Sequence, residues 1–190
     1  MVTLGTVVGT YSEGDGWVTL ASGLTLADQD HSTLAEARVR LAANFDSGAD
    51  ELSVATPGGL TVVWDGSSGT LTLSGNASLA TYQAALRSVR FRSTSENPST
   101  STRTVRWDVQ DGTDWSVATD STLNITAIND APTLDLTNTN VSYTEGDGWL
   151  TLDGGVTLGD VDHTSLTQAT VSFVAGYESG IDELLSLIHI

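Results

Sequence analysis

The chain has 190 residues, of which 39% are hydrophobic, and its seven basic residues, all arginine, face 24 acidic ones, which gives a formal net charge of −17. Such a charge repels phosphate backbones and anionic lipid headgroups, so nucleic acid is not an expected partner. No apolar run approaches the roughly 20 residues that span a bilayer, which argues against membrane insertion, and the lack of cysteine excludes disulfides and thiolate metal sites.

A tandem repeat organises the sequence. The heptad that runs from Tyr11 to Trp17 returns from Tyr143 to Trp149, 132 residues later, with one serine changed to threonine. Residues 11–52 and 143–184 align without a gap, and 23 of the 42 aligned positions are identical. We therefore expect one complete module in residues 1–130 and the truncated N-terminal part of a second module in residues 131–184.

Short alternating runs of apolar and polar residues, separated by Gly, Asp, Asn and Ser clusters, are typical of an all-β sandwich. The predicted strands, in chain order, are 17–20, 35–43, 52–55, 60–64, 70–73, 88–91, 103–109 and 116–128. The last run is expected to break near Asp120 and to resume at Thr122 as a final strand.

Residues 78–89 have a different pattern, because four apolar side chains recur at helical spacing and Ser78 can cap the N-terminus. These apolar side chains are Leu79, Tyr82, Leu86 and Val89. The pattern predicts a short helix that bridges two strands and covers the core.

The segment Asn129-Asp-Ala-Pro132 closes the first module. Because proline has no backbone donor and holds its predecessor in extended geometry, we expect a short, stiff connector. Residues 185–190 fit neither the repeat nor the polar alternation. They resemble the translation of a sequencing adapter, so we expect them to be an artefact in an environmental-DNA (metagenomic) reading frame.

Acidic residues recur at matching places in the two copies and at the connector. The Glu-Gly-Asp-Gly turns contain Glu13 and Glu145, the Asp-x-Asp motifs contain Asp28, Asp30, Asp160 and Asp162, and the connector contains Asn129 and Asp130. Hard oxygen ligands suit Ca²⁺, which takes about six to eight of them. Solvated turns would explain a single Asp-x-Asp, but the repetition favours calcium. The acidic loops 46–51 and 178–183, in contrast, look like ordinary loops that enter a strand.

His31 and His163 directly follow the Asp-x-Asp motifs. We expect each to hydrogen-bond a neighbouring carboxylate or to pack in a turn, rather than to ligate a metal. No serine or cysteine stands out as a nucleophile for these histidines, so the sequence gives no support for a catalytic triad and no enzyme is expected.

The five tryptophans allow a second hypothesis. Trp17 and Trp149 share one register in the repeat and are expected to pack in the core or at a module end. Trp64, Trp107 and Trp115 could form a platform on which sugars stack, although a tryptophan in a β-sandwich is more often buried. A carbohydrate-binding module that recognises surface glycans through exposed tryptophans is therefore the alternative function.

Four phrases of the sequence resemble the cadherin-like β-sandwich repeats of very large secreted bacterial proteins, including RTX adhesins exported by type I secretion. The phrases are residues 80–89, 97–105, 108–112 and 127–132. The resemblance implies cadherin- or immunoglobulin-like Greek-key modules in tandem, at the cell surface or outside the cell. Its implied partners are neighbouring repeats of the same chain and, through other domains, a host or matrix receptor or a glycan.

The resemblance also implies Ca²⁺ between successive modules. The implied interdomain ligands are Glu13, Asn129, Asp130, Asp160 and Asp162, and Asp28, Asp30 and Asp111 form a half-site toward a preceding module. The sequence departs from the family in having no Asp-Arg-Glu in the body of the module, which implies fewer or weaker calcium ions. The implied function is a calcium-stiffened structural spacer without catalysis of its own.

Overall fold

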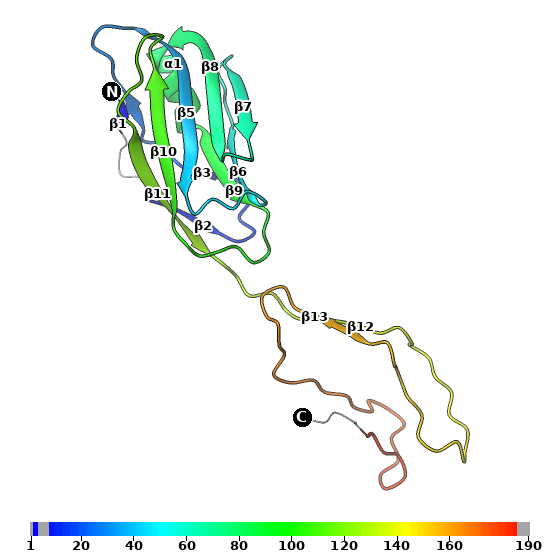
Figure 1. Ribbon diagram of the computed structural model, residues 1–190. Coiled ribbons are helices and arrows are strands. Elements are labelled where there is room, and N and C mark those ends of the chain that lie inside the picture. Colours follow the sequence, from blue (N-terminus) through cyan, green and yellow to red (C-terminus); the bar gives the residue numbers. More distant parts are fainter. Residues whose placement is uncertain (1, 4–7, 186–190) are drawn as a thin grey trace. The chain divides into compact units, whose positions relative to one another are not determined.

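A computed structural model of the chain describes residues 2–3 and 8–185, and the adapter-like residues 186–190 lie outside this range. The chain divides into two compact units, Met1–Ala131 and Pro132–Ile190. The described residues form short and long β-strands and one small helix (Figure 1). The predicted all-β class is therefore confirmed.

Two sheets build the first unit in a sandwich-like arrangement. The six-stranded sheet has the order β2 (Val8–Ser12), β11 (Thr119–Thr126), β10 (Arg103–Gln110), β5 (Thr33–Ala43), β8 (Thr70–Ser78) and β7 (Thr61–Asp65). The three-stranded sheet has the order β3 (Val18–Thr19), β9 (Val89–Ser93) and β6 (Asp50–Val54). Neighbouring strands are antiparallel except β2 and β11, which are parallel. A short pair, β1 (Val2–Thr3) and β4 (Thr25–Leu26), completes the unit.

The core lies where side chains of both sheets meet. Along β5, Ala37, Val39 and Leu41 are buried, whereas the residues between them are not, as expected for a strand with one solvated face. Tyr11 of β2 and Phe91 of β9 join the two sheets through an edge-to-face contact with ring centroids 5.1 Å apart.

The helix α1 (Leu79–Arg87) confirms the helix expected from the apolar spacing. The Ser78 hydroxyl caps it by accepting a hydrogen bond from the Thr81 amide at 3.1 Å. Tyr82 and Leu86 are buried and Leu79 packs against the core at its margin. Val89, the fourth member of the apolar spacing, begins strand β9 and is also buried.

Because of a buried tyrosine on α1, the unfolding free energy should fall with rising pH in the alkaline range. Burial, with the charge of Glu36 as a smaller cause, raises the pKa of Tyr82 to about 12. Because this folded pKa exceeds the value of about 10 for an unfolded tyrosine, the contribution of Tyr82 is fully present below pH 10 and is lost as the pH rises toward 12.

We expect the Tyr82→Phe variant to lose about 1 kcal/mol at neutral pH, since the Tyr82 hydroxyl donates to the Gly75 carbonyl at 2.7 Å. The variant should also show a shallower fall in unfolding free energy between pH 10 and 12. Denaturant titrations of both proteins at several alkaline pH values measure this difference. Parallel curves would show that Tyr82 ionisation does not contribute to alkaline unfolding.

Two strand predictions need correction. The run 116–128 does not break at Asp120, because β11 is continuous from Thr119 to Thr126 and Asp120 pairs with Arg106 of the neighbouring strand. The interruption comes earlier, where Trp115 makes only an isolated bridge to Gln110. Strand β2 was not predicted, and β8 runs to Ser78 rather than ending at residue 73.

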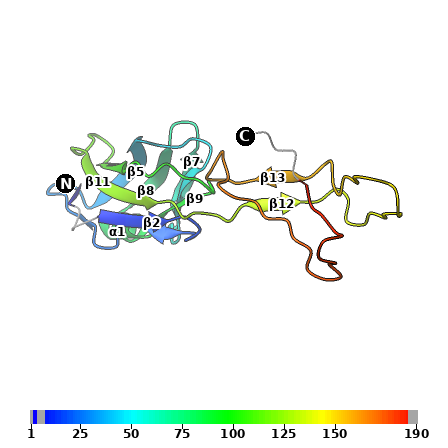
Figure 2. The same cartoon turned by 90° about the horizontal axis from the view of Figure 1, so that it is seen from below.

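The second unit has little regular structure. Its described residues form two strands, β12 (Thr133–Asp135) and β13 (Thr157–Gly159), which pair antiparallel and correspond by the repeat to β1 and β4. Both views show this pair of arrows, and the other described residues of the unit form loops (Figures 1 and 2). Many apolar side chains of the described part of this unit are exposed, including Trp149 at 66%. Core packing of Trp149, one of the two expected placements, is therefore wrong in this chain.

Candidate metal centres

The repeated heptad forms the same tight turn in both units. In the first unit, Ser12 donates its amide to the Asp15 carboxylate, and the Asp15 amide donates to the Ser12 carbonyl. Gly14 and Gly16 have φ values of 79° and 69°, a region that favours glycine. Thr144 and Asp147 make the same pair of hydrogen bonds in the second unit. Asp15 thus shapes the turn that presents Glu13.

Glu13 links this turn to the end of the last strand. Its side chain is 8% exposed, and its Oε2 accepts a hydrogen bond from the Ile128 amide at 2.8 Å. The Glu13 amide donates in turn to the Thr126 carbonyl. These bonds fix the Glu13 carboxylate beside the residues that lead into the connector.

Three carboxylates meet at that place, and we call them the connector cluster: Glu13, Glu96 and Asp130. One oxygen from each lies within 4.8 Å of the others. Glu96 comes from the loop between β9 and β10, and its side chain is exposed. The structure thus brings together two predicted ligands, Glu13 and Asp130, and adds one that the sequence did not indicate.

The three oxygens of the connector cluster lie close enough together to hold one metal ion. Two oxygens bound to one Ca²⁺ at about 2.3 to 2.6 Å can be separated by at most about 4.6 to 5.2 Å, and the 4.8 Å within which the cluster oxygens lie falls inside this range. Carboxylates are also the ligand type that Ca²⁺ prefers, whereas zinc and copper favour imidazole or thiolate. Three carboxylates leave coordination positions for further oxygens.

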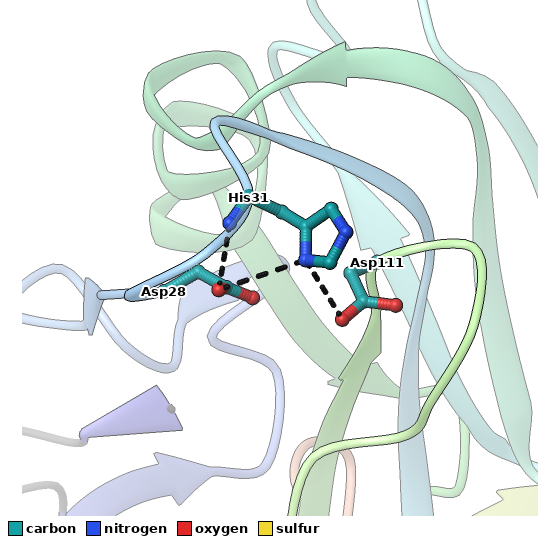
Figure 3. Close-up of side chains that lie close together, drawn as sticks. All are labelled: Asp28, His31 and Asp111. Carbon is teal, nitrogen blue, oxygen red and sulfur yellow. Dashed lines mark hydrogen bonds and ion pairs between the residues drawn. The ribbon is translucent and has the colours of Figure 1, made fainter.

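A second group, which we call the half-site cluster, comprises Asp28, His31 and Asp111. The imidazole lies between the two carboxylates, with its Nδ1 3.4 Å from Asp111 Oδ2 and 4.0 Å from Asp28 Oδ1 (Figure 3). The His31 amide also donates to Asp28 Oδ1 at 3.0 Å. His31 therefore has the neighbouring carboxylates that were expected for a hydrogen-bonding role.

Backbone amides hold the half-site carboxylates in their ionised form. The Asp30 and His31 amides lower the pKa of Asp28, and the Asp114 and Thr113 amides lower that of Asp111. Asp30 itself is exposed and is not among the groups whose ligand atoms converge in the described chain. Its amide shapes the loop by donating to Asp28.

The second unit repeats this loop with Asp160, Asp162 and His163. The His163 and Asp162 amides donate to Asp160 Oδ1 at 2.8 and 2.9 Å, and these bonds lower the pKa of Asp160. Ligand atoms of the three side chains lie within 4.8 Å of one another. Asp160 and Asp162, which were predicted as ligands, therefore lie together within their own unit.

The connector itself is shaped by Asn129, whose side-chain amide donates to the Asp130 carbonyl at 2.6 Å. The unit boundary falls between Ala131 and Pro132. Asn129 and Asp130 thus form the last part of the first unit before that boundary.

The loop 46–51, expected to be an ordinary loop entering a strand, contains a buried acid. Asp50 and Arg103 have side chains that are both 0% exposed, and Arg103 Nε lies 2.9 Å from Asp50 Oδ2. Asp50 also accepts a hydrogen bond from the Asp46 amide. The loop therefore has a structural role, since its Asp50 carboxylate forms a buried ion pair with Arg103.

The tryptophans do not share one exposed surface. Trp107 is 1% exposed and donates through its indole to the Ser121 hydroxyl, and Trp64 packs against the core with an edge-to-face contact to Phe45. Trp115 is 38% exposed and lies under the Arg38 guanidinium, 3.5 Å from it.

Trp17 is not among the core residues. Its ring lies beside the guanidinium groups of Arg90 and Arg92, at 4.7 and 4.6 Å from the ring centroid. Trp17 therefore packs on the arginines of strand β9.

Comparison with known proteins identifies no family, because no protein-family model and no curated protein matches the chain. Among the described residues, no helix is both long and apolar enough to cross a bilayer, and α1 has nine residues.

Proposed function

We propose that the chain is a spacer segment of an extracellular bacterial adhesin or giant surface protein, built from cadherin-like Greek-key modules in tandem. In this proposal, Ca²⁺ stiffens the joint between successive modules. The segment performs no catalysis, its partners are neighbouring modules of the same chain, and receptor or glycan binding belongs to other domains.

The observation that carries the proposal is the connector cluster. Glu13, Glu96 and Asp130 come from three separate places in the sequence, yet their oxygens converge within 4.8 Å next to the unit boundary. Glu13 is nearly buried and fixed by the Ile128 amide, which is the kind of support that a preorganised ligand needs. We propose that Asp160 and Asp162 of the second unit supply further ligands.

Electrostatics explains why a cation would stiffen the joint. Two carboxylates about 4 Å apart repel by on the order of 4 kcal/mol at the effective dielectric constant typical of a protein surface. With a net charge of −17, the chain gains from any cation that bridges such groups. Without the ion, the acids of the two units repel, and with it they become ligands of one centre.

Calcium titration of the full chain tests the proposal. We expect Ca²⁺ at 100 times its dissociation constant to stabilise the first unit by about 2.7 kcal/mol, measured by thermal unfolding. Small-angle scattering should show a larger radius of gyration as the joint becomes straight. Replacing Glu96 and Asp130 by glutamine and asparagine should abolish both effects, because the cluster loses two of its three charges.

Two further variants distinguish the loss of a calcium ligand from the mere removal of negative charge. Asp135→Asn removes an exposed acid of β12 outside the acidic clusters and should leave the calcium response unchanged. Asp160→Asn combined with Asp162→Asn should abolish the change in scattering. If this double variant still straightens with calcium, or if the unaltered chain responds to neither measurement, the proposed joint is wrong.

A further inference from the structure

The second unit exposes the apolar residues whose counterparts form the core of the first unit. Val171 corresponds to Val39 and is 73% exposed, whereas Val39 is 0% exposed. Other pairs show the same contrast: Tyr143 and Tyr11, Leu166 and Leu34, Phe173 and Leu41, Leu184 and Leu52. The second unit therefore has a core-forming sequence whose apolar residues remain uncovered.

The first unit shows what covers these residues when a module is complete. Strands β2, β3, β5 and β6 lie within residues 8–54, and their pairing partners are β8, β9, β10 and β11. Val39, for example, lies between Leu71 of β8 and Trp107 of β10. All these partner strands come from residues 70–126, and the sequence contains this segment once.

Local structure, in contrast, is already present in the second unit. The heptad turn, the Asp160 loop and the hydrogen bond from the Glu178 amide to Asp182 repeat the bonds of the first unit. The pair β12–β13 likewise repeats β1–β4. Among the described residues of the second unit, the long-range strand pairings that the first unit makes with residues 70–126 are missing.

We propose that residues 132–184 form a binding half of a module, and that their apolar side chains take up a polypeptide segment with the strand sequence of residues 53–131. The occupant is defined by the first unit, where this segment already binds the homologous half. Because 23 of the 42 aligned positions are identical, the two halves offer the segment closely similar partners. This inference does not depend on calcium.

Hydrogen exchange of the full chain, mixed with a free fragment of residues 53–131, tests the proposal. The fragment is diluted from urea into the protein, and exchange is followed by mass spectrometry in peptides from residues 165–175. These residues correspond to β5, so we expect their amides to exchange at least tenfold more slowly once the fragment pairs with them on both sides. Unchanged exchange would count against the proposal.

Two matched variants locate the binding surface. Val171→Asp places a charge where Val39 is buried in the first unit, and it should abolish the protection. Val174→Asp alters a side chain that is 95% exposed and whose counterpart Ala42 is also exposed in the complete module, so protection should persist. Equal effects of the two variants would overturn the proposed surface.

A fused chain makes the test independent of the fragment's solubility. When residues 53–131 are appended directly after Leu184, residues 132–184 should become as protected as residues 11–52. If exchange in 132–184 stays as fast as in the original chain, the proposal fails. Protection that rises with protein concentration without any fragment, and that the fragment does not increase, would show that second units pair with each other and would also overturn it.

Discussion

The Arg103→Ala variant is expected to lose about 3 to 5 kcal/mol of unfolding free energy, because it leaves the Asp50 carboxylate buried without its cation. Both side chains are 0% exposed. Arg103 donates through Nε and Nη2 to Asp50, at 2.9 and 3.4 Å, and through Nη1 to the Ser99 and Ser101 carbonyls. Removing the Arg103 side chain therefore leaves one carboxylate and two carbonyl groups without their hydrogen-bond donor.

The exposed pair formed by Arg106 and Asp120 provides the control. Its side chains are 40% and 43% exposed, although Arg106 Nη2 lies only 2.7 Å from Asp120 Oδ2. Solvent screening limits such a pair to about 0 to 1 kcal/mol, so Arg106→Ala should have a small effect. Urea unfolding followed by tryptophan fluorescence compares the variants. Losses of similar size would mean that burial does not determine the contribution of the Arg103 pair.

Trp107→Ala should lower the unfolding free energy by about 3 to 5 kcal/mol, through lost apolar burial and the cavity that remains. Trp107 is 1% exposed and is among the largest fully buried side chains of the described chain. Its indole also donates to the Ser121 hydroxyl at 2.9 Å, and the variant removes this donor from a buried oxygen. Thermal and urea unfolding measure the loss.

Trp115→Ala is the matched substitution at an exposed tryptophan. The residue is 38% exposed, and its ring contacts the Arg38 guanidinium. A cation–π contact of this kind contributes about 0.5 to 1 kcal/mol at an exposed site, and the partly exposed side chain buries less apolar surface than Trp107, so the variant should lose clearly less unfolding free energy than Trp107→Ala. A loss as large as that of Trp107→Ala would show that Trp115 has a core role that its exposure does not indicate.

Local sequence patterns predicted much of the fold of the first unit. Alternation identified β5 and β10 because each has one buried and one solvated face, and helical spacing with a serine cap identified α1. Strand β2 was missed since its pairing depends on β11, which is far away in the sequence. The expected break at Asp120 failed for a similar reason, because an arginine on the neighbouring strand pairs with that acid.

The candidate site shows the same division between local and long-range information. Repetition pointed to Glu13, Asp28 and Asp160, whose turns are fixed by bonds to residues close in sequence. Glu96 could not be predicted, because it lies in a loop outside the repeated segment and reaches Glu13 only through folding. Likewise, Asp50 belonged to a repeated motif, but only the fold reveals its pairing with Arg103.

The parallel pairing of β2 with β11 has a mechanical consequence. Val8 lies opposite Thr122 and Ser12 lies opposite Thr126. A stretching force that pulls β2 toward its N-terminus and β11 toward its C-terminus acts along both strands in opposite directions. The hydrogen bonds between these strands are then loaded together in shear, rather than opened one after another. The first unit can therefore resist tension that is applied through these two strands.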